Sequence, residues 1–352
     1  MIPHSRPFTG SKEWQAAKRV IASGHLAQGR EVARLEKELC SFVGHRYGLA
    51  VSSGTAALYA ALKALDIGTG DNVIIPTYAC TALANAVCMA GAQPVLCDVD
   101  GETALMSVAS VRASLMKNTR AVIVPHLFGY PAPVHDIEQE TGLPVIEDCA
   151  QCIGAEINGK TVGSLSSIAI FSFYATKVLC AGEGGMTATS DSRLARRLED
   201  LREYDNRDRW EPRFNLKCSD VHAAIARVQL ARLPGFIRRR RTLAKRYQKA
   251  IIDNKYIAAF PTVTERVKPM FYRFIIRTAG RNRSAVIRYF TGQKIACARP
   301  IYKPFHRYLK RDGFPVSRRL YGELLSIPLY PALSDQQGRT MENTLRTLTL
   351  QN

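Results

Sequence analysis

Two residues that could do chemistry follow two short apolar segments in the middle of the chain. Residues 145–148 (VIED) end in Asp148, and residues 168–173 (IAIFSF) lead into YATK, which ends in Lys177. Segments of this length and composition are typical of buried β-strands. In α/β folds the carboxyl ends of parallel strands open onto a crevice where ligands bind. We therefore expect Asp148 and Lys177 to face the same crevice.

Each residue alone has an ordinary interpretation, Asp148 as a loop acid or helix cap and Lys177 as a solvated lysine. Together they suggest more. A lysine in a partly desolvated pocket can attack a carbonyl group as a free amine. An acid at the far end of that pocket can keep a pyridine nitrogen protonated, which makes the ring an electron sink. The pair suits pyridoxal phosphate as cofactor, with Lys177 and Asp148 as the catalytic residues.

A candidate phosphate site lies earlier in the chain. A short strand, residues 49–52, leads into Ser53, Gly54 and Thr55, and the helical pattern AALYAALKAL follows. Free backbone amides and the positive end of the helix dipole make such a helix start an anion site. An ordinary cap by Ser53 or Thr55 is the alternative. Beside a lysine and an acid, phosphate binding by Gly54 and Thr55 is the favoured interpretation.

The motifs around the lysine resemble the signature of the DegT/DnrJ/EryC1/StrS family of pyridoxal-phosphate-dependent sugar aminotransferases. The matching segments are EDCAQ (147–151), GSLSS (163–167), FSFYATK (171–177) and GEGG (182–185). The resemblance continues in residues 27–39, 52–58, 70–78 and 213–233, so it covers most of the first two thirds of the chain.

The resemblance also implies a cofactor-binding set. Its members are Gly54, Thr55, Cys80, Asp148, Gln151, Ser172, Lys177 and Asn215. Lys177 would bind the cofactor covalently and act as general acid and base, and Gln151 would lie near the ring hydroxyl. Ser172 would join the phosphate site. Asn215 would reach the phosphate from a neighbouring subunit, which implies a homodimer with shared active sites.

One departure from the family pattern concerns the cofactor ring. Family members usually carry an aromatic side chain that stacks on the ring, but PTYAC places Cys80 at the matching position. Either Cys80 lines that face as a small apolar group or Tyr78 covers it. A second departure is Tyr130, where a glutamine is common. These changes point to an unusual substrate pocket.

The fold class follows from alternation along the chain. Between residues 49 and 147, strand-like and helix-like segments alternate, which predicts a largely parallel sheet covered on both faces. The resemblance implies the type I aminotransferase fold, an α/β architecture. We expect a large domain over residues 1–234, with a helical opening segment packed against it, and a smaller C-terminal α+β domain over residues 235–352.

The C-terminal third carries the weakest resemblance, although SIPLYPALSD (326–335) is similar to the family's ending. This smaller domain would close over the substrate. His306 and Tyr302 are candidates for substrate contact, but a surface or interface position is the preferred interpretation of His306.

The composition limits the function classes. Forty-nine Lys and Arg against 30 Asp and Glu give a formal charge of +19 in 352 residues. A basic excess favours polyanions and helps to steer phosphorylated substrates. The four arginines at 238–241 fit either a nucleic-acid patch or the solvated face of a long helix. No recognition motif accompanies them, so specific nucleic-acid binding is not expected.

Metal binding and membrane insertion are not expected either. Nine cysteines include one CxxC, Cys149 and Cys152, without a second pair or a histidine cluster, so we expect reduced thiols and no metal site, with a redox pair as the alternative. The opening residues lack the apolar core of a secretory signal. Residues 73–97 are uncharged, but prolines and a glycine interrupt them. We expect a cytoplasmic protein without a membrane partner.

The resulting expectation is a pyridoxal-phosphate-dependent aminotransferase. It would move an amino group from an amino acid, with glutamate as the expected donor, to a nucleotide-linked keto sugar in amino-sugar, cell-surface polysaccharide or secondary-metabolite biosynthesis. Lys177 argues against the family's dehydratases, which carry histidine there. A cofactor-binding regulatory protein, an enzyme acting on another small keto compound and a basic nucleic-acid-binding protein remain alternatives.

Overall fold

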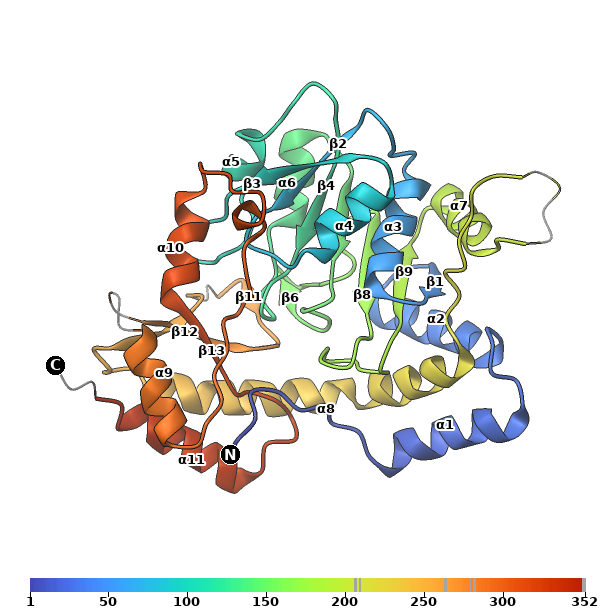
Figure 1. Cartoon of the computed structure of the whole chain (residues 1–352). Helices are drawn as coiled ribbons and strands as arrows, with labels where there is room; N and C mark the ends of the chain where they lie inside the picture. Colours follow the sequence, from blue (N-terminus) through green and yellow to red (C-terminus); the bar gives the residue numbers. More distant parts are fainter. Residues whose placement is uncertain (206–207, 209, 263–264, 279, 281–282, 350–352) are drawn as a thin grey trace.

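A computed structural model describes residues 1–205, 208, 210–262, 265–278, 280 and 283–349. It has a large sheet covered by helices and a smaller C-terminal part (Figure 1). The long helix α8 (Asp220–Ala250) runs along both parts (Figure 1). Within the described ranges, no helix combines the length and the apolar character needed to cross a membrane.

The large sheet has seven strands in the order β1-β9-β8-β5-β4-β2-β3. These strands are β1 (Tyr47–Val51), β2 (Asn72–Pro76), β3 (Gln93–Cys97), β4 (Thr119–Pro125), β5 (Val145–Asp148), β8 (Ile168–Ser172) and β9 (Gly185–Thr189). Only β9 runs antiparallel to its two neighbours, and the other adjacent pairs are parallel. The predicted, largely parallel sheet is therefore confirmed.

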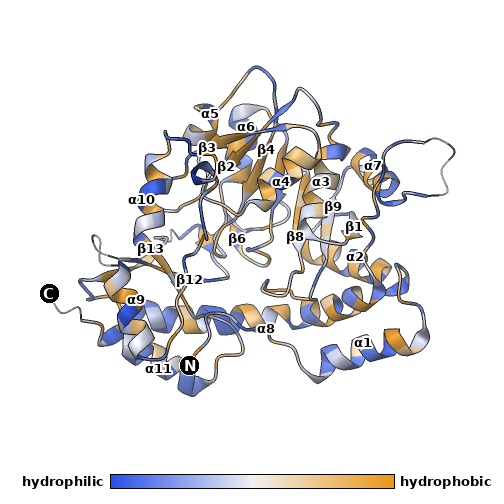
Figure 2. Cartoon of the chain, viewed as in Figure 1, coloured by the Kyte–Doolittle hydropathy of each residue, from blue (hydrophilic) through white to orange (hydrophobic). Residues whose placement is uncertain are grey.

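Helices cover both faces of this sheet. They include α2 (Arg30–Val43), α3 (Gly54–Ala64), α4 (Ala82–Met89), α5 (Val108–Arg112), α6 (Val134–Thr141) and α7 (Ser192–Arg202), whereas α1 (Ser11–Ser23) packs on α8. In β2, Val73 and Ile75 enter the core on the side of α3, whereas Ile74 enters the core on the opposite side. Successive side chains of a strand point to opposite faces, so a doubly covered strand must be apolar throughout. Figure 2 shows this as orange strands in the centre.

The opening segment differs in part from the expectation. α2 buries Val32, Leu35 and Leu39, as its periodicity predicts. The residues before Ser11 are not helical, and they join the C-terminal part rather than the large sheet. The Ile2 amide donates to the Lys294 carbonyl at 2.8 Å, which satisfies backbone groups that a free terminus would leave to water.

The C-terminal part is a small α+β unit, as the resemblance implies. Its antiparallel sheet contains β10 (Ile257–Phe260), β12 (Phe274–Thr278) and β13 (Leu324–Ile327), and its helices are α9 (Arg283–Gly292), α10 (Pro315–Glu323), α11 (Asp335–Arg346) and the short 3₁₀ helix η1 (Phe305–Arg307). A third sheet joins it to the large part. This sheet pairs β11 (Val267–Lys268) with β6 (Glu156–Ile157), and β6 with β7 (Lys160–Thr161).

Helix α8 connects the two parts without a break. Its first half packs on α1 and α2, and its second half packs on α11. Pro234 lies inside this continuous helix. The division of the chain at residues 234 and 235 therefore falls within one secondary-structure element, and it stays a prediction.

The arginine run at 238–241 lies on α8, a long helix as expected, but it is not a solvated face. Arg238 is exposed and Arg240 is buried. Arg239 pairs with Asp335, and Arg241 donates to a backbone carbonyl. The run therefore binds C-terminal segments to α8 through ion pairs and hydrogen bonds, because a guanidinium group can donate several hydrogen bonds at once.

Arg240 makes more hydrogen bonds to the C-terminal segments than any other arginine of this run. Its Nη1 atom donates to the carbonyl oxygens of Phe271 at 3.1 Å, Tyr272 at 2.9 Å and Leu329 at 2.9 Å. Burial lowers the pKa of the guanidinium to about 10, so it keeps its charge at neutral pH. One buried cation thus satisfies three carbonyl groups from two separate segments.

We expect Arg240→Met to lower the free energy of unfolding by about 3 kcal/mol, because three buried carbonyl groups lose their donor. Urea denaturation of the purified protein measures this. Arg238→Met removes the same charge from an exposed position of the same run, so it is the matched control and should stay within about 0.5 kcal/mol of the wild type. Equal effects of the two substitutions would contradict the role of Arg240.

Candidate active site

A cavity of about 200 Å³ lies at the carboxyl ends of the parallel strands. Seven of the eight cofactor-binding candidates line it: Gly54, Thr55, Cys80, Asp148, Gln151, Ser172 and Lys177. They follow or end β1, β2, β5 and β8, which are separated by up to 120 residues in sequence but lie in one sheet. Parallel strands place their carboxyl ends on one edge, and this brings the seven residues together.

Asp148 is the last residue of β5, and its side chain is buried. Its Oδ1 atom accepts a hydrogen bond from the Ala150 amide at 2.9 Å. Burial raises the pKa of Asp148, and the Ala150 amide and the charge of Lys177 oppose this increase without cancelling it. A positively charged group in the cavity would therefore be needed to hold Asp148 firmly in its ionised form.

Lys177 follows β8, the strand that pairs with β5. Its amide donates to the Tyr174 carbonyl at 2.8 Å, which turns the chain so that the side chain enters the cavity. The amine lies 5.9 Å from the centre of the Tyr272 ring. The Tyr272 hydroxyl donates to the Thr176 carbonyl at 3.1 Å.

Tyr272 comes from the C-terminal part, and the sequence analysis missed it. Burial raises its pKa, but the charges of Arg273, Lys177 and Arg240 and the hydrogen bond to Thr176 together outweigh burial, so the net shift is downward. The segment FYRFIIR shows an apolar strand pattern around this position but no sign of a partner so far away in sequence. Glu183, in the motif GEGG, also lines the cavity and was not among the candidates.

The start of α3 forms the other end of the cavity. Ser53 caps the helix, with its Oγ atom accepting from the Ala56 amide at 3.1 Å. Gly54 and Thr55 are the next residues, and first-turn amides have no partner within their own helix. A Cβ atom at Gly54 would lie 2.8 Å from the Cβ atom of Ser172, so only glycine fits there. Capping by Ser53 is therefore present, it leaves room for an anion site beside it, and phosphate binding by Gly54 and Thr55 stays a prediction.

Cys80 and Tyr78, the two alternatives for the face of the cofactor ring, lie in different places, and the role of Cys80 beside the ring stays a prediction. Cys80 lines the cavity, whereas Tyr78 is fully buried in the core and does not line it. Cys80 is exposed, and desolvation by surrounding protein atoms raises the pKa of its thiol. Tyr130 is buried and makes an edge-to-face contact with Phe271.

Gln151 is held at the cavity wall. Its Oε1 atom accepts from the Phe128 amide at 3.1 Å. This bond fixes the carboxamide, and its nitrogen is left as a donor without a protein partner among the described residues.

Asn215 lies outside this cavity. It is exposed, and its Oδ1 atom accepts from the Lys217 amide at 3.2 Å. Its contact with a neighbouring subunit stays a prediction.

His306 is buried, so its interpretation as a surface or interface histidine was wrong within this chain. Its Nδ1 atom lies 2.9 Å from the Thr77 Oγ1 atom, and its amide donates to the same oxygen. Burial lowers its pKa. Tyr302 is exposed.

A buried pair behind Asp148 also escaped the sequence analysis. The Glu147 Oε1 atom lies 2.9 Å from the His126 Nε2 atom and accepts from the Gly163 amide at 2.6 Å, and Oε2 accepts from the Leu165 amide at 3.0 Å. With Cys149, these side chains form a group whose potential ligand atoms lie within 4.8 Å of one another. Backbone amides already occupy both carboxylate oxygens, so the group is a structural network rather than a metal site.

The CxxC cysteines behave as core residues. Cys149 and Cys152 are free and buried, and burial raises the pKa of both thiols well above the ordinary value. A thiol of this kind is a poor nucleophile and metal ligand.

Comparisons with known proteins place this arrangement in a family. The model of the DegT/DnrJ/EryC1/StrS aminotransferase family matches residues 7–346. The chain belongs to this family. It is 34% identical over 343 residues to a UDP-N-acetyl-3-dehydro-α-D-glucosamine 3-aminotransferase from Acidithiobacillus ferrooxidans, covering 93% of this chain and 91% of the relative.

Solved structures of this DegT/DnrJ/EryC1/StrS aminotransferase family agree with the fold. The aminotransferase TlmJ from Streptoalloteichus hindustanus is 31% identical, with a TM-score of 0.91 and 98% of each chain covered. DesV from S. venezuelae is 29% identical, with a TM-score of 0.89, covering 95% of this chain and 93% of that chain. The family, the aminotransferase activity and the fold class expected from the sequence are confirmed.

We expect Gly54→Ala to weaken the binding of pyridoxal phosphate about tenfold or more. The added Cβ atom meets Ser172, and overpacking of this kind costs about 1–3 kcal/mol. Titration with the cofactor, followed by absorption, measures the affinity. Gly292→Ala, at a helical position with no atom within 4 Å of the added Cβ, is the control. Unchanged affinity in Gly54→Ala would contradict this phosphate site.

Proposed function

We propose that this chain is a pyridoxal-phosphate-dependent aminotransferase that transfers an amino group from L-glutamate to a nucleotide-linked keto sugar. The observation that carries the proposal is the meeting of Asp148, Lys177 and the start of α3 in one cavity. The relative from Acidithiobacillus ferrooxidans, named for a UDP-linked 3-dehydro sugar, supports a nucleotide-linked acceptor.

The residues present fit pyridoxal phosphate. Gly54, Thr55 and Ser172 form an anion cradle that an added Cβ atom would fill, and the dipole of α3 is positive there. Lys177 supplies an amine and Asp148 a buried acid. When bound, the cofactor supplies an electron sink for the negative charge that develops on the substrate carbon.

The catalytic work of the chain divides between these two residues. Lys177 would act as the general base that removes the proton from the α-carbon of the amino donor, and later as the acid that returns a proton to the acceptor. Asp148 would hold the proton on the ring nitrogen through a charge-assisted hydrogen bond. The ring of Tyr272, fixed by its bond to Thr176, would limit the positions open to the lysine amine.

In this proposal the protein acts as a cytoplasmic homodimer in amino-sugar or cell-surface polysaccharide biosynthesis. Asn215 of each subunit would reach the phosphate in the neighbouring cavity. Exposed aromatic side chains next to it support this, because Trp210 is 87% exposed and Phe214 is 54% exposed. Large apolar residues on one exposed segment are typical of protein interfaces.

The test is the absorption spectrum of the protein with pyridoxal phosphate, before and after L-glutamate. We expect a visible band that gives way to the near-ultraviolet band of the pyridoxamine form. Lys177→Ala should not give the visible band, whereas Lys160→Ala, at an exposed lysine on β7, should behave like the wild type. A band that resists glutamate and other amino donors would instead favour a regulatory cofactor-binding protein.

We expect Asp148→Asn to bind the cofactor but to react with glutamate about 10²–10³ times more slowly, because a neutral amide cannot hold the ring proton. The Ala150 amide can still donate to the asparagine oxygen, so the fold should persist. Single-turnover absorption measurements give the rate, and Asp136→Asn, at an exposed position of α6, is the control. A rate within about threefold of the wild type would argue against this role for Asp148.

A further inference from the structure

Three guanidinium groups surround one tyrosine in the C-terminal part. The central carbon atoms of Arg283, Arg299 and Arg307 lie 5.8, 4.4 and 4.7 Å from the centre of the Tyr321 ring. Arg283 donates to the Tyr321 carbonyl and Arg299 to the Tyr321 hydroxyl. We call these four residues the arginine cluster.

The positive charge of the arginine cluster is not neutralised by the acids next to it. Asp312 and Glu323 line the adjoining cavity, but they pair with Arg318 and Arg277. In the described part of the chain, no carboxylate pairs with any arginine of the cluster. Burial lowers the pKa of Arg283, and the nearby charge of Arg299 lowers it further. Such a group of like charges would be stabilised by a bound anion.

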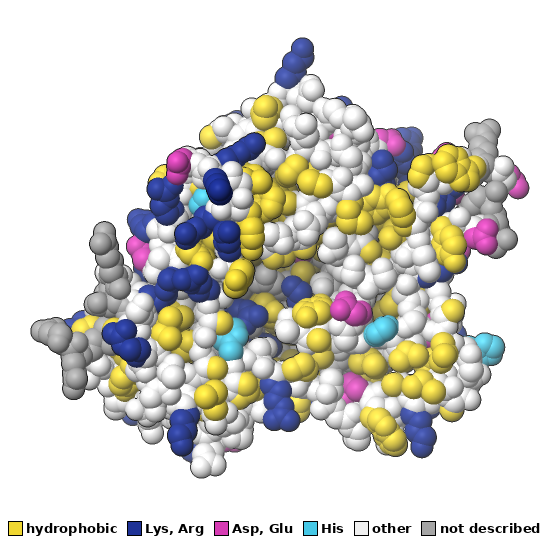
Figure 3. All heavy atoms as spheres, viewed as in Figure 1, with side chains coloured by type: hydrophobic (Ala, Val, Ile, Leu, Met, Phe, Trp, Pro, Cys, Tyr) yellow, Lys and Arg dark blue, Asp and Glu magenta, His cyan; other side chains and the backbone are white. Residues whose placement is uncertain are grey.

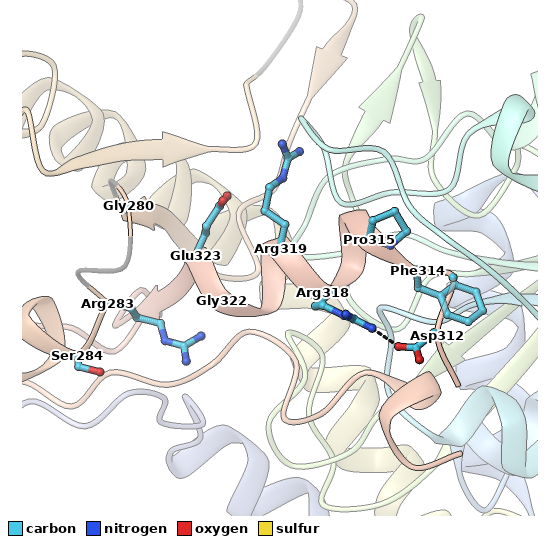
Figure 4. A pocket seen from close by; sticks show the side chains of 11 residues that line it. Gly280, Arg283, Ser284, Asp312, Phe314, Pro315, Arg318, Arg319, Gly322 and Glu323 are labelled. Atoms are coloured by element: carbon cyan, nitrogen blue, oxygen red, sulfur yellow. Dashed lines mark hydrogen bonds and ion pairs between the residues drawn. The ribbon is translucent and has the colours of Figure 1, made fainter. Parts of the chain in front are cut away.

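A cavity of about 1060 Å³ opens beside the arginine cluster and is lined by Arg283, Arg318 and Arg319. Figure 4 shows Arg283 and Arg318 on one side of α10, and Arg319 and Glu323 on the other. A second hollow, lined by Arg307, shares Arg318 with it. Basic side chains gather on the surface over α10 (Figure 3), so the field around the cavity attracts anions.

The Tyr78 hydroxyl gives an independent indication of a ligand. Tyr78 is fully buried, and its hydroxyl has no hydrogen-bond partner in the described part of the chain. Its phenol lies within electrostatic range of Arg283, Tyr321 and Arg299. A buried hydroxyl without a partner is unfavourable, and an oxygen atom of a bound anion could accept a hydrogen bond from it.

The arginine cluster is connected to the cofactor cavity by the loop that follows β2. Thr77 accepts a hydrogen bond from the Phe305 amide at 2.8 Å and contacts His306, the residue before Arg307. Tyr78 lies within electrostatic range of the cluster, and Cys80 lines the cofactor cavity. An anion at the cluster would therefore lie one loop away from the reacting groups.

We propose that the arginine cluster binds the diphosphate of the nucleotide-linked acceptor, an inference that rests on the proposed function. Guanidinium groups match phosphate oxygens in pairs, and three of them suit a group with two phosphates better than a single carboxylate. The position of the cluster next to the loop of residues 77–80 favours the substrate over a separate phosphorylated effector. The cluster would hold the nucleotide end while the keto carbon enters the cofactor cavity.

The experiment measures the binding of UDP and inorganic pyrophosphate to the cofactor-loaded protein by calorimetry. We expect Arg283→Gln and Arg299→Gln each to weaken UDP binding about tenfold or more, the loss of a charge-assisted hydrogen bond. Arg288→Gln removes the same charge from an exposed position of the same helix, α9, and should change UDP affinity less than about twofold. The visible band of bound cofactor identifies variants that have not folded.

Two outcomes overturn the inference: no binding of either ligand by the wild type, or equal affinities in the cluster variants and Arg288→Gln. UDP-N-acetylglucosamine separates the two sources of diphosphate. If it displaces UDP, the cluster holds a nucleotide sugar, and if both bind together, the cluster holds a free effector and the assignment to the substrate fails. The glutamate reaction of the wild type tests the proposed function separately, because it needs no nucleotide.

Discussion

The burial of Asp148 at the end of β5 is the constraint on which the site depends. Burying an ionised carboxylate costs free energy unless positive charge and hydrogen bonds compensate for its lost hydration. Ala150, Lys177 and His126 each favour the ionised form, yet burial still raises the pKa. The cavity is therefore suited to a ligand that brings its own positive charge to this acid. A protonated pyridine nitrogen would be such a group.

The residues around Asp148 are also held in defined positions by hydrogen bonds. Glu147 and Asp148 are consecutive in β5, so their side chains point to opposite faces of the sheet. Glu147 turns away from the cavity and binds the Gly163 and Leu165 amides and His126. These bonds tie the loop before β8 to the end of β5, and β8 leads to the lysine. One strand end thus positions both Asp148 and Lys177, the proposed catalytic residues.

Local patterns were enough to predict the large sheet and most of the candidate site. Short sequence segments are enough to identify strand ends and helix starts. Asp148, Lys177 and Gly54 could therefore be recognised without knowledge of distant contacts. The remaining features depend on pairs far apart in sequence. The bond between His306 and Thr77 spans 229 residues, and the isolation of Arg240 from water depends on segments around 271 and 329. No periodicity marks such pairs, because each side chain meets its partner only after the chain has folded.

The loop after β2 shows how the two parts of the molecule can share one reaction. Its Thr77 is bonded to η1, its Tyr78 lies within electrostatic range of the arginine cluster and its Cys80 lines the cofactor cavity. The buried bonds of Thr77 to His306 connect this loop to the segment that carries Arg307. The large sheet would then supply the chemistry, while the C-terminal part would select acceptors whose anionic group and keto carbon match the separation between the cluster and the cavity. In the proposed site, the small side chain of Cys80 would leave room between the two for the sugar.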